Sequence, residues 1–451
     1  MINNLSQLHI YDCFYKLQLS LKAGSDKITS QKYHSILGSE ANLILKKINN
    51  KTYKFSRYTQ TLVKNNRLVY SPTIRDRIVL DLLKDSLINK YKIKFQDRNK
   101  ICGEIKRTLE NGFKFTILKL DITNFYNSIP HNLLYNKLKC SSLLSETEYL
   151  LVKRALSQSS KGVLQGLPIS NCLAEIYLES FDKEMKSIDN RLCYFARYVD
   201  DVILIFNGFL LSSEISSIFK IINSKISKLG LSTNPNKTLQ LSLNDNCSFD
   251  YLGYNFKLSN PSLNNTKKHI GNDISIEISS SKLFKIKDKI NSYFDDYLRT
   301  RNFNLLHQRL TYISSSCYGL KFVQYSTNNV FNSYTKKISF GIYDSYKLAS
   351  NASFKVINNY ISYLVKKHSS NFTNNEKRKL FKCRFKESNP HFINFHKFTN
   401  DDYIDLIKKI DSTYIPPSSN ARHTLIYDYF KLLNTQTIWY ENLSDSFNLI
   451  I

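Results

Sequence analysis

Hydrophobic positions recur every three to four residues over much of the first hundred positions of the chain. The segments SILGSEANLILKKI (35–48) and RIVLDLLKDSLI (77–88) show this period, which is typical of helices with one apolar face. Between them, Asn65-Asn66 separates LVK from RLVY, and a polar pair between two such runs predicts a β-hairpin. We therefore expect a mainly helical N-terminal part that contains one hairpin.

From Phe113 the pattern alternates between short apolar runs and helical periods. FTILKLDI (115–122) predicts a strand that ends on Asp121, and NCLAEIYLESFDKEM (171–185) predicts a helix. ARYVDDVILIF (196–206) then predicts a strand, a turn and a second strand. A further helix precedes STNPNKTLQLSL (232–243) and a strand pair that ends at DYLGYNF (250–256). This alternation around one mixed or antiparallel sheet predicts an α+β fold.

A polar segment with Pro and Gly, KLSNPSLNNTKKHIGN (257–272), indicates a domain boundary. Beyond it, helical spacing returns in SKLFKIKDKINSYFDDYL (281–298), where the apolar stripe is expected to be core. KKHSSNFTNNEKRKLFKCRFK (366–386) is the densest basic run, and it fits either a solvated helix face or a nucleic-acid contact. We expect an all-α extension after the boundary.

Length and charge narrow the class of protein. A chain of 451 residues is long enough for two or three domains. Its 64 Lys and Arg against 37 Asp and Glu give a net charge of +27, which favours a polyanionic partner such as nucleic acid. A general bias towards Lys, Asn, Ile and Ser would produce the same excess without such a partner.

Cysteine and histidine spacing argues against several other classes. The eight Cys include no CxxC pair and the nine His no HExxH, so zinc sites and dense disulfide scaffolds are disfavoured. The first residues lack a basic start followed by an apolar stretch, and no apolar run approaches about 18 residues. We therefore expect no membrane association and a reducing, cytoplasmic location.

Three aspartates stand where strands are expected to end or turn. Asp121 follows FTILKL, and Asp200-Asp201 lies between YFARY and VILIF. Taken singly, an Asp-Asp pair is common in solvated turns, and Asp121 could cap a helix. Phosphoryl transfer to a growing chain, however, needs divalent metals held by oxygen ligands on rigid elements. A strand-end Asp and a pair on a hairpin turn could together supply those ligands.

Six segments in order carry a resemblance to a known family: RLVYSPTIRDRIV, LKLDITNFYNSIP, VLQGLPISNCLAEIYL, ARYVDDVILIF, GLSTNPNKT and FDYLGYNF. Together they resemble the bacterial reverse transcriptases related to group II intron and retron enzymes, over about residues 20–256. The resemblance implies a right-hand polymerase, with fingers and N-terminal helices over 1–110 and a palm with an antiparallel sheet over 111–260. Thumb-like helices would occupy 270–345, and a basic helical domain 346–451.

The resemblance implies a split metal site. Asp121 corresponds to the first catalytic carboxylate, with the carbonyl of Ile122 as a further metal contact. Asp200 corresponds to the indispensable carboxylate of the Tyr-X-Asp-Asp turn, and Asp201 to its lesser member. The expected cofactor is a pair of Mg²⁺ ions, for which Mn²⁺ can substitute, with the primer 3′-hydroxyl and the leaving pyrophosphate as their targets.

The resemblance also implies a nucleotide site and a primer grip. The expected nucleotide-binding residues are Lys64, Arg67, Arg75, Tyr126, Gln165, Gly166 and Lys237. Arg67 would grip the triphosphate through its planar fork, Tyr126 would exclude a 2′-hydroxyl, and Lys237 would approach the triphosphate. The primer grip would comprise Tyr251, Leu252, Gly253 and Tyr254. From the residues alone, Tyr126 and the primer-grip aromatics could equally be core, and Lys237 a surface lysine. Arg77 could simply pair with Asp76 or with a neighbouring helix.

Departures from the relatives shape the functional expectation. The chain lacks the Val-Thr-Gly tripeptide of retron enzymes and the Cys/His cluster of intron endonucleases. What remains resembles the abortive-infection and defence-associated reverse transcriptases of bacteria. We expect an RNA-directed DNA polymerase, a nucleotidyltransferase acting in antiphage defence. Its expected partners are an RNA template such as a cognate non-coding RNA, a DNA primer or product, and dNTPs, with a homo-oligomer or a second defence protein as further candidates.

Two alternative functions stay open from the sequence. One is a protein-primed, template-independent DNA polymerase, for which the 30 Tyr residues would offer many priming hydroxyls. The other is an RNA-binding protein with an inactive polymerase fold, against which the intact Asp121, Asp200, Arg67 and Gln165 argue.

Overall fold

The computed structural model describes residues 2, 5–17, 21, 23–63, 67–110, 114–243, 247–259, 273–327, 330–386, 391–416 and 422–433. Its contacts divide the chain into two compact units. The first contains Met1–Ile101 and Arg107–Asp245, and the second contains Cys102–Lys106, Asn246–Leu263 and Asp273–Ile451. Each unit is a body of its own and is described separately.

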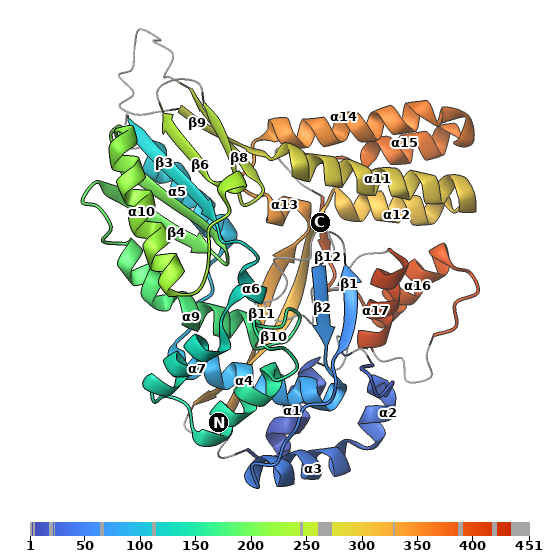
Figure 1. The fold of residues 1–451 in the computed structure, drawn as a ribbon. Helices are drawn as coiled ribbons and strands as arrows, with labels where there is room; N and C mark the ends of the chain where they lie inside the picture. The colour runs from blue at the N-terminus through green and yellow to red at the C-terminus, as the bar shows by residue number, and fades with distance from the viewer. Residues whose placement is uncertain are drawn as a thin grey trace. The chain divides into compact units, whose positions relative to one another are not determined.

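A four-stranded antiparallel sheet forms the centre of the first unit, in the order β4-β5-β3-β6. The strands are β3 (Phe115–Asp121), β4 (Leu192–Tyr198), β5 (Asp201–Asn207) and β6 (Leu239–Leu243). Side chains at alternate positions, such as Leu118 and Leu204, join the main hydrophobic core. Ile117 and Ile205 on the opposite face are also buried, so both faces of the sheet are covered. Helix α10 (Ser212–Lys228) runs along one of these faces (Figure 1).

Helices and one hairpin make up the rest of the first unit. The hairpin pairs β1 (Thr59–Val63) with β2 (Arg67–Ser71), as expected, although its two Asn lie outside the described residues. Helix α4 is buried on most sides and packs against α1, α3, α8 and α9. Thr73 caps its N-terminus, because the Thr73 hydroxyl accepts a hydrogen bond from Asp76 N. The helices are α1 (Gln7–Leu17), α2 (Ser30–Ser35), α3 (Leu37–Asn49), α4 (Ile74–Tyr91), α6 (Phe125–Ser128), α7 (His131–Cys140), α8 (Glu146–Leu156), α9 (Ser170–Met185) and the 3₁₀ turn η3 (Pro235–Lys237), while α5 (Arg98–Glu110) contributes to both units.

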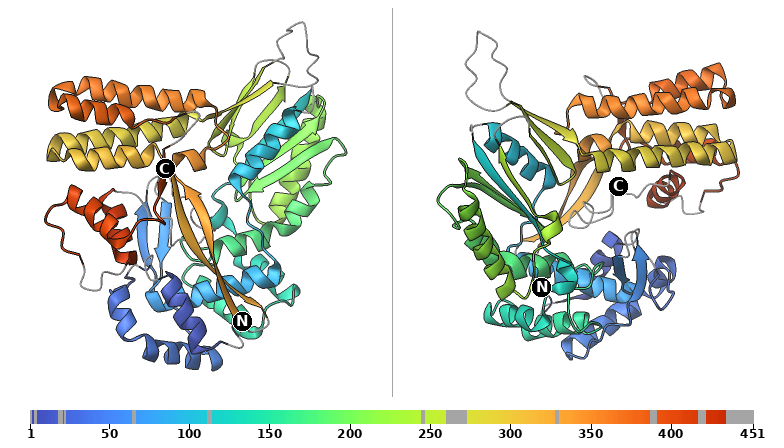
Figure 2. Two further views of the ribbon diagram at one scale, coloured as in Figure 1. Left: turned by 180° about the vertical axis from the view of Figure 1, so that it is seen from behind. Right: turned by 45° about the horizontal axis from the view of Figure 1, so that its top comes forward.

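Four helices of the second unit pack as a bundle: α11 (Ser280–Thr300), α12 (Phe303–Ile313), α14 (Asn351–Lys367) and α15 (Asn374–Lys382). Figure 2 shows these four running side by side in both views. The apolar stripe of α11 is core, as expected, since Ile286, Ile290 and Phe294 are buried. The remaining helical elements are α13 (Ile342–Ser345), η4 (Ser369–Asn371), α16 (Asn400–Ile410) and α17 (Arg422–Leu432).

Two three-stranded sheets complete the second unit. One has the order β7-β8-β9, from β7 (Ser248–Tyr251), β8 (Tyr254–Ser259) and β9 (Asp273–Ile278). The other has the order β11-β10-β12, from β10 (Ser316–Thr327), β11 (Val330–Phe340) and β12 (Phe392–Asn394). Phe340, Phe395, Tyr403 and Phe430 belong to a separate core beneath this second sheet, α16 and α17.

The α+β class is confirmed, but the expectation of an all-α extension is wrong. Strands β10 and β11 form an eleven-pair antiparallel ladder in the segment where thumb-like helices were expected, and β12 follows later. SCYGLKFVQYST and VFNSYTKKISF are rich in aromatic and β-branched residues, which suit a pleated strand better than a helix. The four-domain division of the chain remains a prediction.

Candidate active site

The register of the central sheet places two of the three aspartates directly opposite each other. Asp121, the last residue of β3, pairs with Asp201, the first residue of β5. Directly opposed residues in an antiparallel pair project from the same face, with Cβ atoms about 4.5–5.5 Å apart. Ile122 N donates a hydrogen bond to Asp200 O at 3.2 Å, which ties the end of β3 to the turn. Thus the two distant segments meet at one end of the sheet.

The turn between β4 and β5 holds a strained backbone. Tyr198 pairs with Asp201, leaving Val199 and Asp200 as the two turn residues. Val199 has φ +58°, a left-handed conformation that is unfavourable for a β-branched residue. Strain of this kind persists only where the surroundings impose it.

Arg197 supplies part of that surrounding structure. Its guanidinium is buried and forms ion pairs with Glu175 and Asp182 of α9, both at 2.7 Å. Nη1 also donates to Val199 O at 2.9 Å. Burial opposes the charge of Arg197, but the two carboxylates and their hydrogen bonds raise its pKa further above its usual range. The active-site turn is therefore anchored to α9.

The two carboxyl groups of the turn, Asp200 and Asp201, have raised pKa values. Burial raises the pKa of Asp200, and the nearby charge of Asp121 adds to this effect. Burial and then the charge of Asp200 raise the pKa of Asp201 to about 6. Like charges at close range disfavour ionisation, so a bound cation would favour the ionised forms of Asp200 and Asp201.

In the structure, Lys237 supplies a positive charge to this cluster. Its Nζ lies 3.1 Å from both Oδ1 and Oδ2 of Asp121. This hydrogen bonding raises the pKa of Lys237, which therefore stays charged. Residue Asn234, which precedes the 3₁₀ turn η3, donates from its backbone N to Asp121 O at 2.8 Å. The ammonium thus contacts the oxygen atoms that a metal would use.

The donor set fits a hard cation such as Mg²⁺, although Lys237 contacts both carboxylate oxygens of Asp121 in the structure. Carboxylate and carbonyl oxygens are the ligands that this hard cation prefers. Within the described residues, no three His, Cys, Asp or Glu side chains are arranged closely enough to hold a metal. Asp121, Asp200, Asp201 and the Ile122 carbonyl would be the residues that hold a metal, and Lys237 occupies the Asp121 oxygens in the structure.

The hairpin β1–β2 is docked onto the loop that precedes α9. Tyr70 N donates to Gln165 O at 2.7 Å, and Arg67 Nε donates to Gln165 Oε1. Gly166 has φ +96°, and a Cβ there would lie 2.5 Å from Tyr70 O. Only glycine fits this close approach. Exposed Arg67 therefore lies beside Gln165 and Gly166, and the role of these three residues in nucleotide binding stays a prediction.

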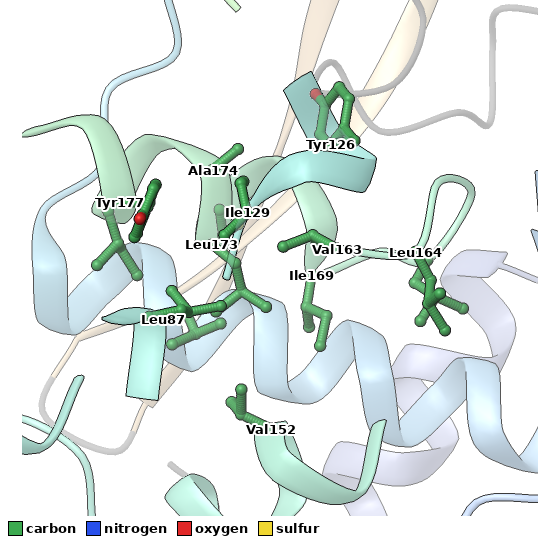
Figure 3. Close-up of a cluster of buried hydrophobic side chains, with 14 of the residues drawn as sticks. Leu87, Tyr126, Ile129, Val152, Val163, Leu164, Ile169, Leu173, Ala174 and Tyr177 are labelled. Atoms are coloured by element: carbon green, nitrogen blue, oxygen red, sulfur yellow. The ribbon is translucent and has the colours of Figure 1, made fainter. Parts of the chain in front are cut away.

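Tyr126 lies at the edge of the core between α6 and α9. Tyr126 belongs to the same hydrophobic core cluster as Ile129, Val163 and Leu173, and Figure 3 shows its ring at the margin of that cluster. Its hydroxyl donates to Asn171 Oδ1 at 2.6 Å, and burial raises its pKa, so the phenol stays neutral. The ring is held in one orientation, as a rigid steric gate would be.

Several expected site residues have other surroundings. Arg75 pairs in a bidentate way with Glu40 of α3, at 2.5 and 2.9 Å, so its role in nucleotide binding stays a prediction. Arg77 pairs with Asp81 at 2.7 Å. Lys64 lies outside the described residues.

The expected primer grip belongs to the second unit. Tyr251 and Tyr254 are buried and paired across β7 and β8. Leu252 and Gly253 have φ +48° and +82° and form the two-residue turn between them. The two rings are therefore core residues, and the role of the turn as a primer grip stays a prediction.

Sequence reasoning missed the residues that support the site. Arg197 binds Glu175 and Asp182, which are seven positions apart on α9 and therefore project from one helix face. That spacing, together with a charged residue in a largely apolar strand, was the available signal. Asn171 and Asn234 had no comparable signal.

Comparison with known proteins accords with this geometry. Residues 46–256 match the family described as reverse transcriptase (RNA-dependent DNA polymerase). The retron Ec83 reverse transcriptase of Escherichia coli is 29% identical over 151 residues, which cover 30% of this chain and 47% of that protein. The chain thus spans about half the length of this curated relative.

Solved structures with some likeness include two telomerases. The apo enzyme from Candida tropicalis, truncated from its C-terminal domain, matches with a TM-score of 0.35 and 15% identity, over 52% of this chain and 61% of that one. Telomerase from Candida albicans with a fragment of telomeric RNA matches with a TM-score of 0.38 and 14% identity, over 89% and 63%. Separately, none of the helices in the described part is long and apolar enough to cross a membrane.

The match spans the hairpin, the Gln165 loop, Asp121 and the Asp200-Asp201 turn, which the structure independently brings into one unit. Over residues 46–256, this chain is therefore similar to the reverse transcriptase family.

Proposed function

We propose that the protein is an RNA-directed DNA polymerase that adds deoxynucleotides to a primer 3′ end by two-metal nucleotidyl transfer. The observation that carries this proposal is the pairing of Asp121 with Asp201 beside the Asp200 turn. Divalent metals are general to reverse transcriptase domains, and the oxygen donors here favour Mg²⁺, with Mn²⁺ as a substitute. Bound metal would lower the pKa of the attacking hydroxyl and offset charge on the leaving pyrophosphate.

The side chains of the site have separable roles in this proposal. Asp121 and Asp200 hold the metals, the Ile122 carbonyl assists, and Asp201 tunes the charge of the cluster. Arg67 binds phosphate oxygens, and Gln165 and Gly166 shape the contact with the nascent base pair. The ring of Tyr126, fixed by Asn171, excludes a 2′-hydroxyl. Lys237 leaves Asp121 and binds the triphosphate instead. It then donates a proton to the departing pyrophosphate.

Partners follow from the same proposal. A chain of charge +27 suits an RNA template and a DNA primer or product, with affinity that falls as salt rises. The relative's description as a retron reverse transcriptase supports a role in antiphage defence with a cognate non-coding RNA. A homo-oligomer or a second defence protein is part of this proposal.

The test is primer extension by the purified full chain with Mg²⁺, dNTPs and an RNA template annealed to a DNA primer. Asp200→Asn is expected to abolish nucleotide addition while RNA affinity stays within about twofold. Asp288→Asn, an exposed carboxylate on α11, is the matched control and should retain full activity. Wild-type levels of synthesis by Asp200→Asn would overturn the proposal, as would equal loss of RNA binding.

The product distinguishes the alternatives. DNA copied from the template supports the proposal. DNA that is unrelated to any template and covalently attached to the protein would instead identify a protein-primed polymerase. RNA binding without any DNA synthesis, under conditions where a known reverse transcriptase extends the same primer, would identify an inactive polymerase fold.

A further inference from the structure

The loop between α10 and β6 is fastened to the end of β3 on both sides of the turn η3. We call residues 232–238 the η3 loop. Thr233 pairs with Ile122 in an isolated antiparallel bridge. The ladder of β6 with β3 begins further along, where Leu239 pairs with Lys119. The η3 loop has more residues between these two pairs than β3 has, so it bulges out beside the end of that strand.

Asn234 opens the bulge and connects it to β3. Its backbone N donates to Asp121 O at 2.8 Å. Its side-chain Oδ1 accepts from Asn236 N at 3.1 Å, which caps η3. Its backbone O accepts from Lys237 N at 3.2 Å and from Thr238 Oγ1 at 2.9 Å. Asn234 thus ties the second half of the loop to the last residue of β3.

The turn η3 is held by local restraints rather than by packing. None of the three residues Pro235–Lys237 is buried. Pro235 at the first position fixes φ at about −65°, which suits a 3₁₀ turn. Asn is favoured before such a turn because its side-chain oxygen can accept from a backbone N–H two residues on. Removing the Asn234 side chain should therefore loosen the turn without opening the core.

Lys237 is the residue whose position depends on this turn. Its side chain is 62% exposed, so burial does not fix the ammonium. The ammonium lies 3.1 Å from both carboxylate oxygens of Asp121. Under the proposed function Lys237 leaves Asp121 for the triphosphate, and the carboxylate then no longer restrains it. The hydrogen bonds of Asn234 to the main chain of the loop do not involve Lys237 Nζ, so they can persist after this exchange.

We propose that Asn234 is a positioning residue for nucleotide addition, which holds the backbone of Lys237 beside the end of β3 while the ammonium moves from Asp121 to the triphosphate. The inference rests on the proposed function and adds a residue to which that function gives no part. Displacing a catalytic group by about 1 Å can slow a reaction by about a hundredfold, so a loosened turn should lower the rate of nucleotide addition.

A second contact of Asn234 offers a different explanation, which the test must separate. Asn234 Nδ2 lies 3.5 Å from Asp121 Oδ2, at the limit of a hydrogen bond. If this contact were the important one, Asn234 would act on the carboxylate rather than on Lys237. The contact is long, and the same oxygen already accepts from Lys237 Nζ, so we favour action through the turn.

A double-mutant cycle in single-turnover primer extension separates these two routes. Asn234→Ala should lower the rate of nucleotide addition by about threefold or more. In a Lys237→Met background, the same substitution should change the rate by less than about twofold, because the residue that Asn234 positions is gone. An equal slowing in both backgrounds would overturn the proposal and assign Asn234 to Asp121 or to folding.

Asn234→Ser provides the rescue. Serine is also a favoured capping residue, and it keeps a side-chain oxygen for Asn236 N while it removes Nδ2, so this variant should retain at least about half of the wild-type rate. Asn136→Ala, at an exposed position of α7, is the matched control and should extend the primer normally. Thermal melting checks that each variant folds. A serine variant as slow as the alanine variant would overturn the proposal.

Hydrogen exchange followed by mass spectrometry reads the loop without any catalysis. In the full chain without metal or nucleotide, peptides that cover 232–238 should exchange faster in Asn234→Ala than in wild type, because Asn236 N loses its acceptor. Asn234→Ser and Asn136→Ala should exchange there as the wild type does. Unchanged exchange in Asn234→Ala would overturn the proposal.

This proposal and the proposed function fail in different ways. If the wild type extends the primer but the losses from Asn234→Ala and Lys237→Met multiply, the role of Asn234 fails alone. If the wild type makes no DNA where a known reverse transcriptase extends the same primer, the proposed function fails, and the role of Asn234 that rests on it falls too.

Discussion

Arg197 donates a hydrogen bond from Nη1 to the carbonyl oxygen of Val199, 2.9 Å away, at the residue where the backbone adopts φ +58°. The same guanidinium forms ion pairs with Glu175 and Asp182. A buried, fully paired arginine thus fixes the conformation of the turn that carries Asp200. Under the proposed function Asp200 is a metal ligand that must be held within a fraction of an ångström, so we expect this support to be needed for catalysis.

Replacing Arg197 by Met should therefore strongly destabilise the protein. Two carboxylates would be left without their buried partner, which is expected to lower the free energy of unfolding by about 3–5 kcal/mol. The matched control is Arg191→Met, since Arg191 also pairs with two carboxylates but is 37% exposed, and its loss should lower the free energy of unfolding far less. Urea denaturation measures both, and similar values for the two variants would refute this account.

The strain at Val199 predicts that a substitution at this position does not destabilise the protein, in contrast to Arg197→Met. Val199→Gly removes a left-handed β-branched residue, whose conformation costs about 1–2 kcal/mol, so the variant should be at least as stable as wild type. Val69→Gly, at a half-buried position in β2, should lose about 1 kcal/mol or more. The freer turn of Val199→Gly should also slow nucleotide addition. Equal destabilisation of the two variants in urea denaturation would show that Val199 is not strained.

Local patterns were sufficient to predict the elements that carry the carboxylates. The run FTILKL is apolar over the length of one strand, and β3 ends at Asp121 as expected. The Asp200-Asp201 pair interrupts two strand-like runs, and the structure turns there. Both features depend on residues adjacent in sequence, which is why a pattern of apolar and polar positions could reveal them.

Features that depend on distant partners could not be predicted in this way. The bonds from Arg197 to Glu175 span 22 positions, and the contact of Lys237 with Asp121 spans 116. Strand β10 pairs with β12 across more than seventy residues. The aromatic and β-branched residues of β10 favour a strand, but this segment follows a long helical pattern and was expected to continue it. Tertiary packing decided these features, and it leaves little trace in local periodicity.

Replacing Gly166 should impair nucleotide addition because a Cβ there would collide with Tyr70 O, and its positive φ angle is only part of the reason. Gly166→Ala would place a Cβ 2.5 Å from Tyr70 O, whereas Gly208→Ala, with φ +80°, meets no atom within 4 Å. Both variants carry left-handed strain of about 1–2 kcal/mol, but only Gly166→Ala should displace the hairpin. We expect a rise in the KM for dNTP of about tenfold or more for Gly166→Ala alone. Steady-state primer extension measures this, and an unchanged KM would contradict the hairpin's role.

Lys237 should have opposite effects on metal binding and turnover. In Lys237→Met the ammonium no longer competes for Asp121, so Mn²⁺ should bind the nucleotide-free protein more tightly. Loss of the proton donor should slow single-turnover nucleotide addition by about tenfold or more. Lys225→Met, which removes a surface ion pair with Glu184, is the control for both measurements. Mn²⁺ affinity measured by electron paramagnetic resonance that is equal in all three proteins would exclude competition by Lys237.

Asp201 should make the metal-free protein less stable as pH rises. Burial and the charge of Asp200 raise its pKa to about 6, against about 3.9 in an unfolded chain. The folded state therefore binds more protons than the unfolded state between these values, and the free energy of unfolding falls as pH increases from about 4 to 6. Asp201→Asn removes this penalty, so with EDTA present it should exceed wild type in stability at pH 7.5 by up to roughly 3 kcal/mol.

The stability difference between Asp201→Asn and wild type should vanish near pH 4. It should shrink when Mg²⁺ is added at pH 7.5, because bound metal stabilises the ionised wild type. Thermal melting across this range, with Asp288→Asn as the exposed control, tests the sign. A pH-independent difference would mean that Asp201 is not the titrating group.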